Sequence, residues 1–315
     1  MIEVKNLVKK YGDHTAVDHL SFHVDKGQIY GFLGPNGAGK STTMNIMTGY
    51  IASTSGEVLI DGHNILEEPE AAKKCIGYLP EQPPLYFDMT VAEYLKFAAE
   101  LKKVPKNERE TQIEQVMELT GITAMANRLI KNLSKGYKQR VGLAQAILGY
   151  PEIIILDEPT VGLDPKQIIE IRELIRKLSE EHTIILSSHI LSEVSAVCDY
   201  IMIINHGKLV ASDTTETLMN HSLGSNTLEL TVKGEKQDVE KMLRDVEEIQ
   251  KLEWKPGENE KTVSMVITTE EKTDIREKLF YMMAEAKMPI LNMQFTKVSL
   301  EDIFLELTQN ETAPV

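Results

Sequence analysis

The sequence has few cysteines, few aromatic residues and no long apolar run. Its two cysteines, Cys75 and Cys198, are far apart and match no metal-binding spacing, which argues against a disulfide scaffold and for a reducing compartment. No apolar run approaches the ~18 residues that are needed to cross a bilayer. The residues after Met1 include no apolar signal region. We therefore expect a soluble, intracellular chain.

Positive charge is also in short supply. Lys and Arg total 34 against 48 Asp and Glu, which gives a formal net charge of -14. Such a chain lacks the broad basic surface that nucleic-acid wrapping requires, so no nucleic-acid partner is expected. Its 315 residues, 42% of them hydrophobic, can form one large or two ordinary domains, and this composition excludes wholesale disorder.

Up to about residue 215, apolar strand-like runs alternate with helical patterns. Strands are expected at Gln28–Leu33, Ile153–Leu156, Thr183–Ser187 and Tyr200–Asn205. The second and third runs are apolar without alternation, which is typical of parallel strands covered by helices on both faces. Thr90–Ile147 is mainly helical and begins with a capping-box pattern. The sequence thus predicts an α/β core with a helical insertion.

A change of composition marks a second part of the chain. His221–Asn226 is small and polar and is predicted to be a linker, so we expect domains over residues 1–220 and 227–315. A final helix is expected at Leu300–Leu307. The order strand, helix, strand, strand, helix, strand predicts a small α+β ferredoxin-like C-terminal domain. Its elements are expected at Thr227–Val232, Val239–Val246, Glu248–Trp254, Thr262–Thr268, Asp274–Ala286 and Ile290–Thr296.

The strongest motif is a phosphate loop. Gly34–Ser41 fits the pattern G-x-x-x-x-G-K-[ST] between a predicted strand and a predicted helix, a context that disfavours an ordinary glycine-rich turn. Backbone N–H groups of such a loop can surround a phosphate, and the helix N-terminus adds a positive dipole. Lys40 can reach the β- and γ-phosphates, and the Ser41 hydroxyl can bind Mg²⁺. We therefore expect a P-loop NTPase whose nucleotide contacts include Gly34, Pro35, Asn36, Gly37, Ala38, Gly39, Lys40, Ser41 and Thr42.

Polar residues follow two of the other predicted strands, at the sheet edge where ligands bind in open parallel sheets. Asp157 is expected to hold Mg²⁺ through water, and Glu158 to orient or deprotonate the attacking water. His189 is expected to hydrogen-bond the γ-phosphate. The alternatives are a solvated turn for the acidic pair and a structural histidine or helix cap for His189. The other histidines, among them His14, His63, His182 and His206, are expected at the surface.

Asn132–Arg140 precedes an apolar helix and can be explained by capping alone. Ser134 is a good N-cap, and Gly136 permits close approach of a phosphate to the helix N-terminus. Together with the phosphate loop, the acidic pair and His189, however, this segment resembles the signature of ATP-binding cassette (ABC) proteins. The match keeps the family's motif order over roughly residues 1–215. The resemblance implies a RecA-like core with an antiparallel β subdomain and a helical subdomain.

The resemblance also implies roles for individual residues. Two nucleotide-binding domains would close head to tail around two ATP molecules, so that Ser134 and Gly136 contact the γ-phosphate held by the partner's loop. Tyr11 would stack on adenine, a half-buried strand tyrosine being the alternative. Asp164, in a sequence that is similar to the family's D-loop, would cross the dimer interface.

One position departs from the family's pattern. Glu81 occupies the place of the usual glutamine after Tyr78–Pro80, and Gln82, which follows it, is a second candidate for that glutamine's role. A carboxylate can still bind Mg²⁺ or position water, so we expect function to be retained with altered coupling. In the signature, Lys135 and Tyr137 replace the commoner glycine and glutamine.

The resemblance implies the ATPase subunit of a transporter, more specifically of a bacterial exporter. Its partners would be integral membrane permease subunits, docked on Pro83–Tyr94, and a second nucleotide-binding domain, identical or paralogous. Ordinary packing is the alternative for Pro83–Tyr94. The chain would then sit at the inner face of the cell membrane, and its C-terminal domain would serve dimer contact or regulation.

Two other classes stay open. A soluble ABC ATPase acting on ribosomes or DNA is disfavoured by the single cassette, the scattered cysteines and the acidic charge. A small-molecule kinase would have no use for the signature and the D-loop.

Overall fold

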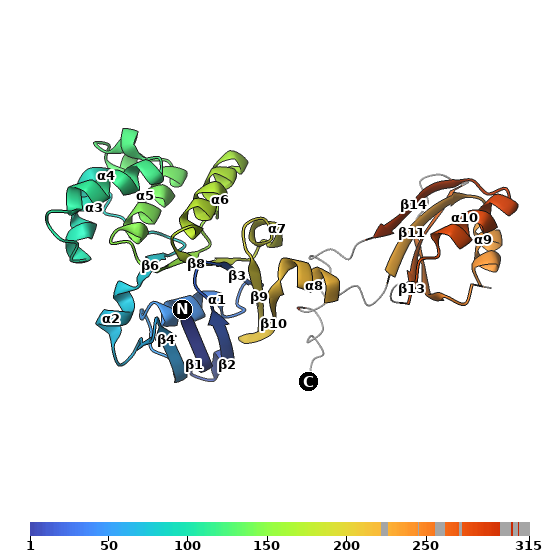
Figure 1. Cartoon of the computed structure of the whole chain (residues 1–315), viewed down its shortest axis with the longest axis horizontal. Coiled ribbons are helices and arrows are strands. Elements are labelled where there is room, and N and C mark those ends of the chain that lie inside the picture. The colour runs from blue at the N-terminus through green and yellow to red at the C-terminus, as the bar shows by residue number, and fades with distance from the viewer. Residues whose placement is uncertain are drawn as a thin grey trace. The chain divides into compact units, whose positions relative to one another are not determined.

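The computed structural model describes residues 1–221, 226–244, 246–255, 262–270, 273–296, 304 and 308. The chain divides into two compact units, residues 1–215 and 216–315 (Figure 1). In the described part of the chain, no helix combines the length and the apolar character that a membrane span requires.

A six-stranded sheet forms the centre of the first unit, in the order β10-β9-β3-β8-β7-β6. Its strands pair in parallel, except that β10 runs antiparallel to β9. Every residue of β3, β7 and β8 is buried, as expected of parallel strands with apolar runs and helices on both faces. The predicted strands are thereby confirmed to within a residue at each end. The four predicted strands are β3 (Ile29–Leu33), β7 (Ile153–Asp157), β8 (Thr183–Ser188) and β9 (Tyr200–Asn205). The sheet also contains β6 (Ile76–Leu79) and β10 (Lys208–Thr214), for which no strand was expected from the sequence.

A second, antiparallel sheet has the order β2-β1-β4-β5. It shares one apolar core with α1 (Lys40–Met47) and with the central sheet, since Leu7, Met44 and Ile155 belong to the same buried cluster. This shared core holds α1 in place, and the phosphate loop with it. The strands are β1 (Ile2–Tyr11), β2 (His14–Val24), β4 (Ser55–Ile60) and β5 (His63–Asn64).

The predicted helical insertion is confirmed. In Figure 1 its helices form a group of their own, away from the antiparallel sheet. The capping box at its start is complete, because the Thr90 side chain accepts from Glu93 N and the Glu93 carboxylate accepts from Thr90 N. The insertion contains α3 (Val91–Leu101), α4 (Arg109–Leu119), α5 (Lys135–Ile147) and two 3₁₀ turns at Thr123–Met125 and Ile130–Asn132. The remaining helices are α2 (Pro69–Lys74), α6 (Pro165–Ser179), α7 (Leu191–Val194) and α8 (Thr215–His221).

The second unit follows the predicted order of elements. Its antiparallel sheet is ordered β12-β13-β11-β14, and the two helices cover an apolar core that includes Leu230, Met265 and Leu279. The predicted helix Leu300–Leu307 lies outside the described residues, apart from Phe304. The elements are β11 (Asn226–Lys233), α9 (Lys236–Leu243), β12 (Ile249–Lys255), β13 (Thr262–Thr269), α10 (Arg276–Glu285) and β14 (Ile290–Thr296).

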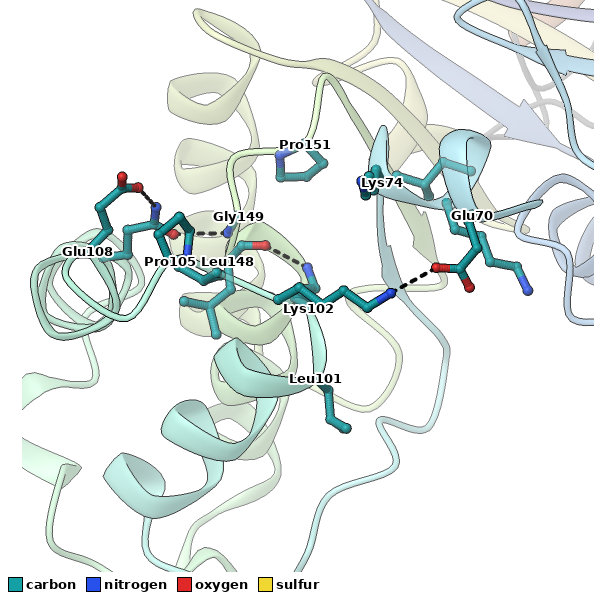
Figure 2. A pocket seen from close by; sticks show the side chains of 14 residues that line it. Glu70, Lys74, Leu101, Lys102, Pro105, Glu108, Leu148, Gly149 and Pro151 are labelled. Carbon is teal, nitrogen blue, oxygen red and sulfur yellow. Dashed lines mark hydrogen bonds and ion pairs between the residues drawn. The ribbon is translucent and has the colours of Figure 1, made fainter. Parts of the chain in front are cut away.

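A cleft of about 540 Å³ separates the helical insertion from α2 and the start of β6 (Figure 2). The Lys102 ammonium reaches into it and donates to the carbonyls of Ala146 (2.8 Å) and Leu148 (2.7 Å). Both carbonyls lie at the C-terminus of α5, where backbone acceptors have no partner within the helix. Lys103 pairs with Glu70 across the same cleft at 3.1 Å. Burial lowers the pKa of Lys102 to about 8. Lys102 therefore ties the end of α3 to the end of α5, and Lys103 ties it to α2.

We predict that Lys102 makes stability depend on pH. The pKa of Lys102 is lower in the folded chain than in the unfolded chain, so between pH 8 and 10 the unfolded chain binds more protons. The wild type should therefore gain about 2 kcal/mol relative to Lys102→Met between pH 7.5 and 9.5. Urea unfolding across this range measures the difference, with the exposed Lys106 changed to Met as control. Parallel curves for wild type and Lys102→Met would show that the prediction is wrong.

Candidate nucleotide-binding site

The phosphate loop connects β3 to α1 in a backbone shape that glycine permits. Gly39 precedes the helix at φ 103°, in the left-handed region. A Cβ atom on Gly39 would lie 2.5 Å from Ala16 O, and one on Gly34 would lie 2.3 Å from Ile204 O. Both positions thus exclude a side chain, and the loop's backbone can approach a phosphate closely.

Lys40, the first residue of α1, is buried with its ammonium turned back over the loop. Its Nζ donates to Gly34 O at 2.7 Å and to Pro35 O at 3.2 Å, and it lies 4.0 Å from Glu158 Oε1. Burial lowers the pKa of Lys40, while Glu158 and Asp157 oppose this shift. A cation held by weak carbonyl acceptors beside the loop is well placed to bind phosphate oxygens.

The predicted metal ligands come together at the end of β7. Asp157 is buried; one of its carboxylate oxygens accepts from the Ser187 hydroxyl and lies 3.5 Å from Ser41 Oγ. A hydroxyl and a carboxylate are the oxygen ligands that Mg²⁺ prefers. Ser41 and Asp157 therefore fit a magnesium ion.

Glu158 and His189 form the second polar pair. His189 Nδ1 lies 3.0 Å from both carboxylate oxygens of Glu158. Glu158 has φ 49°, an uncommon conformation for a residue with a side chain. Its N–H donates to Ser187 Oγ (3.1 Å) and to Ser187 O (3.2 Å), and these bonds hold it there. Strain retained at this position is typical of functional sites.

Lys40, Ser41, Glu158 and His189 open onto one cleft of about 540 Å³, whereas Gly34, Pro35 and Asp157 do not line it. Tyr11 lies at its border, 50% exposed, and Glu81 lines it, whereas Gln82 does not. Residues singled out from the sequence in five separate segments therefore lie around one cleft in the structure. The lining consists of Tyr11, His14, Ala16, Asn36, Gly37, Ala38, Gly39, Lys40, Ser41, Thr42, Glu81, Glu158, Val161 and His189.

The signature residues lie elsewhere in the chain. Ser134 caps α5 by accepting from Tyr137 N, and Asp164 caps α6 by accepting from Gln167 N. Gly136 and Asp164 line a separate cleft of about 310 Å³. Within a single chain, therefore, neither residue lines the nucleotide cleft.

Two histidines differ from expectation. His14, expected only as a surface residue, also borders the nucleotide cleft; its pairing with Tyr11 across the turn between β1 and β2 places it there. The surface prediction for His182 is wrong, because this residue is buried with Nδ1 2.6 Å from Pro151 O. A backbone acceptor from a distant loop satisfies the ring, and no local pattern signals such a contact.

Known proteins match the same part of the chain. The family described as ABC transporter matches residues 17–161. The bacitracin transport ATP-binding protein BcrA of Bacillus licheniformis is 43% identical over 212 residues, which are 67% of this chain and 68% of BcrA. The linearmycin resistance ATP-binding protein LnrL of Bacillus subtilis (strain 168) is 32% identical over 318 residues, 98% of each chain.

Solved structures agree. An ATP-binding subunit of an ABC transporter superposes with a TM-score of 0.65 at 30% identity, covering 70% of this chain and 93% of its own. A dimeric ATP-binding cassette bound to ADP and Pi, in a post-hydrolysis state, gives a TM-score of 0.62 at 27% identity, covering 68% of this chain and 98% of its own. The fold around the cleft is thus the P-loop ABC ATPase fold. The chain belongs to the ABC transporter family, as one of its ATP-binding, ATP-hydrolysing subunits.

Proposed function

We propose that the chain hydrolyses ATP in the nucleotide cleft, which Lys40, Glu158 and His189 line, to power export through a separate membrane permease. The observation that carries this proposal is the buried Glu158 carboxylate, 4.0 Å from Lys40 and 3.0 Å from His189, at the mouth of the phosphate loop. The names of BcrA and LnrL, which refer to bacitracin transport and linearmycin resistance, support export.

The residues of the cleft divide the work of binding. The loop's N–H groups and Lys40 bind the β- and γ-phosphates, and adenine packs against Tyr11. Ser41 and Asp157 hold Mg²⁺, which when bound neutralises charge on the phosphate oxygens. Glu81 borders the same cleft and positions water or the ion in place of the usual glutamine.

Hydrolysis then needs one water and one base. Glu158 accepts a proton from water while the water oxygen attacks the γ-phosphorus. The bond from this phosphorus to the β–γ bridging oxygen breaks, so that ADP and inorganic phosphate form. Because His189 Nδ1 faces Glu158, Nε2 is the atom left to contact the γ-phosphate.

A second nucleotide-binding domain completes the site. Ser134, Gly136 and Asp164 lie outside the nucleotide cleft of their own chain, so they can serve a nucleotide held by a partner. The dimeric cassette with bound ADP and Pi supports this arrangement. The partner is a second copy or a paralogue. The C-terminal unit, which the match to LnrL includes, serves dimer contact or regulation.

The permease docks on Pro83–Tyr94, which includes the first turn of α3. Tyr86 and Phe87 are 54% and 51% exposed there, and we call them the Tyr86–Phe87 patch. The Tyr86 ring packs edge-on against Phe97, and Lys138 Nζ of α5 lies 5.2 Å from the Phe87 ring centroid. Leu85, by contrast, is buried and belongs to the core. Docking on this patch would place the chain at the inner face of the cell membrane.

Glu158→Gln tests the base. An amide cannot take up the proton, so phosphate release should fall by about 100-fold or more while ATP still binds. Gel filtration with ATP and Mg²⁺ should then show an ATP-trapped dimer. Glu114→Gln, on the exposed side of α4, is the charge-matched control. A variant that stays monomeric under these conditions would count against the two-domain site.

Lys40→Ala tests the phosphate contact. Removing the ammonium takes away charge-assisted hydrogen bonds to the phosphates, so the Kd for ATP should rise by about 30-fold or more. Equilibrium binding of a fluorescent ATP analogue measures this, with the exposed Lys74 changed to Ala as control. Unchanged affinity would refute the role given to Lys40.

Changing both Tyr86 and Phe87 to Ala tests the docking patch. Loss of exposed aromatic anchors should weaken association with the permease and leave the ATPase rate of the isolated chain within about twofold. The measurement is the fraction of tagged chain that sediments with the membranes of its native cells. Tyr50→Ala, at an 80% exposed tyrosine, is the control. Equal sedimentation of the double variant and the wild type would rule out this patch.

A further inference from the structure

A buried carboxylate lies behind the catalytic pair and takes part in none of the steps above. Glu193, on the short helix α7, is only 7% exposed. Its Oε2 accepts from the Thr160 hydroxyl at 2.6 Å and from the Ser188 hydroxyl at 3.1 Å. Both hydroxyl residues are themselves buried. Three buried polar side chains thus satisfy one another out of reach of solvent.

Glu193 has no ion pair in the part of the chain that the structure describes. Taking a carboxylate out of water is costly, and here two hydroxyl donors compensate for it. Apolar side chains of similar size could fill the same space at lower cost. Stability alone therefore does not account for this polar cluster, whereas a role in holding the surrounding segments in position would.

The two hydroxyls belong to the two segments that carry the catalytic pair. Thr160 follows Glu158 by two residues in the loop after β7, and Ser188 directly precedes His189 at the end of β8. The Ser188 hydroxyl also accepts from Ile190 N at 3.0 Å, which fixes the turn around His189 from both sides. Glu193 is thus a bridge between the Glu158 loop and the His189 loop.

Neighbouring serines of β8 serve the two sides of the site. Ser187 bonds Asp157 and the N–H of Glu158, whereas Ser188 bonds Glu193. Adjacent side chains of a strand point to opposite faces, so β8 is held from both.

Helix α6 adds a second connection between the same segments. It begins directly after its N-cap, the D-loop residue Asp164. Its Arg172 and Arg176 donate to the carbonyls of Ser192 (3.4 Å) on α7 and of Ala196 after it. The segment that follows Glu158 is therefore tied to the segment that follows His189 along its length.

We propose that Glu193 is a positioning residue for ATP hydrolysis: by bridging Thr160 and Ser188 it keeps Glu158 and His189 in register. This inference rests on the proposed function of that pair. Glu158 holds a strained backbone conformation, and a small displacement of either loop would spoil the alignment of the base with water. The phosphate loop and Tyr11, which bind most of the ATP molecule, belong to other elements, so we expect the bridge to affect ATP hydrolysis far more than ATP binding.

The test uses the full-length chain and steady-state ATP hydrolysis. Glu193→Ala should lower kcat by about tenfold or more and leave KM for ATP within about threefold. Glu193→Gln should have a kcat between those of the wild type and Glu193→Ala, because the amide oxygen still accepts a hydrogen bond from a hydroxyl. Thr160→Val and Ser188→Ala should each lower kcat in the wild type and have no further effect in the Glu193→Ala background.

Thr120→Val separates position from stability. The Thr120 hydroxyl is buried and bonds Val116 O at 2.6 Å, so its loss should lower Tm without changing kcat. If Glu193→Ala lowers Tm and keeps kcat within about twofold of the wild type, Glu193 is structural and the inference is wrong. A further loss of kcat when Thr160→Val or Ser188→Ala is added to Glu193→Ala would also exclude the bridge.

The two proposals fail in different ways. A wild type without ATPase activity, or a Glu158→Gln variant as active as the wild type, would overturn the proposed function. If Glu158→Gln lowers the rate of ATP hydrolysis and Glu193→Ala does not, only the positioning role of Glu193 is wrong.

Discussion

The parallel pairing of β3, β7 and β8 determines where this chain can do chemistry. Leu33 pairs with Ser188, and Asp157 pairs with Ser187, so three strands end at the same level of one sheet edge. Gly34, which opens the phosphate loop, Glu158 and His189 are each the next residue after these strands. Strand register therefore places Glu158 within 3.0 Å of His189 and 4.0 Å of Lys40, because a shift of one residue would turn the side chains to the opposite face.

This register also brings buried charged side chains together, although a charge is costly to remove from water. Lys40, Asp157 and Glu158 are all less than 9% exposed, and each is held by a neighbouring hydroxyl, backbone group or opposite charge. Burying charges in this way costs stability, and it fixes these charged groups in place before a substrate binds. The Ser187 hydroxyl at the end of β8 supplies part of the compensation, through its hydrogen bond to the Asp157 carboxylate.

Sequence reasoning found most of this edge because its signals are local. The phosphate loop, Asp157–Glu158 and His189 each stand directly after an apolar run, and the parallel topology does the rest. Glu193 gave no such signal: it is one of 48 acidic residues, and its burial depends on α7 folding over two hydroxyls. His182 was misjudged for the same reason, since its partner is a carbonyl 31 residues away.

The signature segment packs closely against the start of α6. A Cβ atom on Gly136 would lie 2.5 Å from Gln167 Oε1, so the N-terminus of α5 sits directly against the first turn of α6. Arg140 and Glu170 pair farther along the same two helices. At the other side of α5, Lys138 covers Phe87 of the docking patch. Helix α5 thus contacts both the Tyr86–Phe87 patch and the start of α6. If the proposed docking on this patch displaced α5, the displacement would also reach the signature segment and the N-terminus of α6.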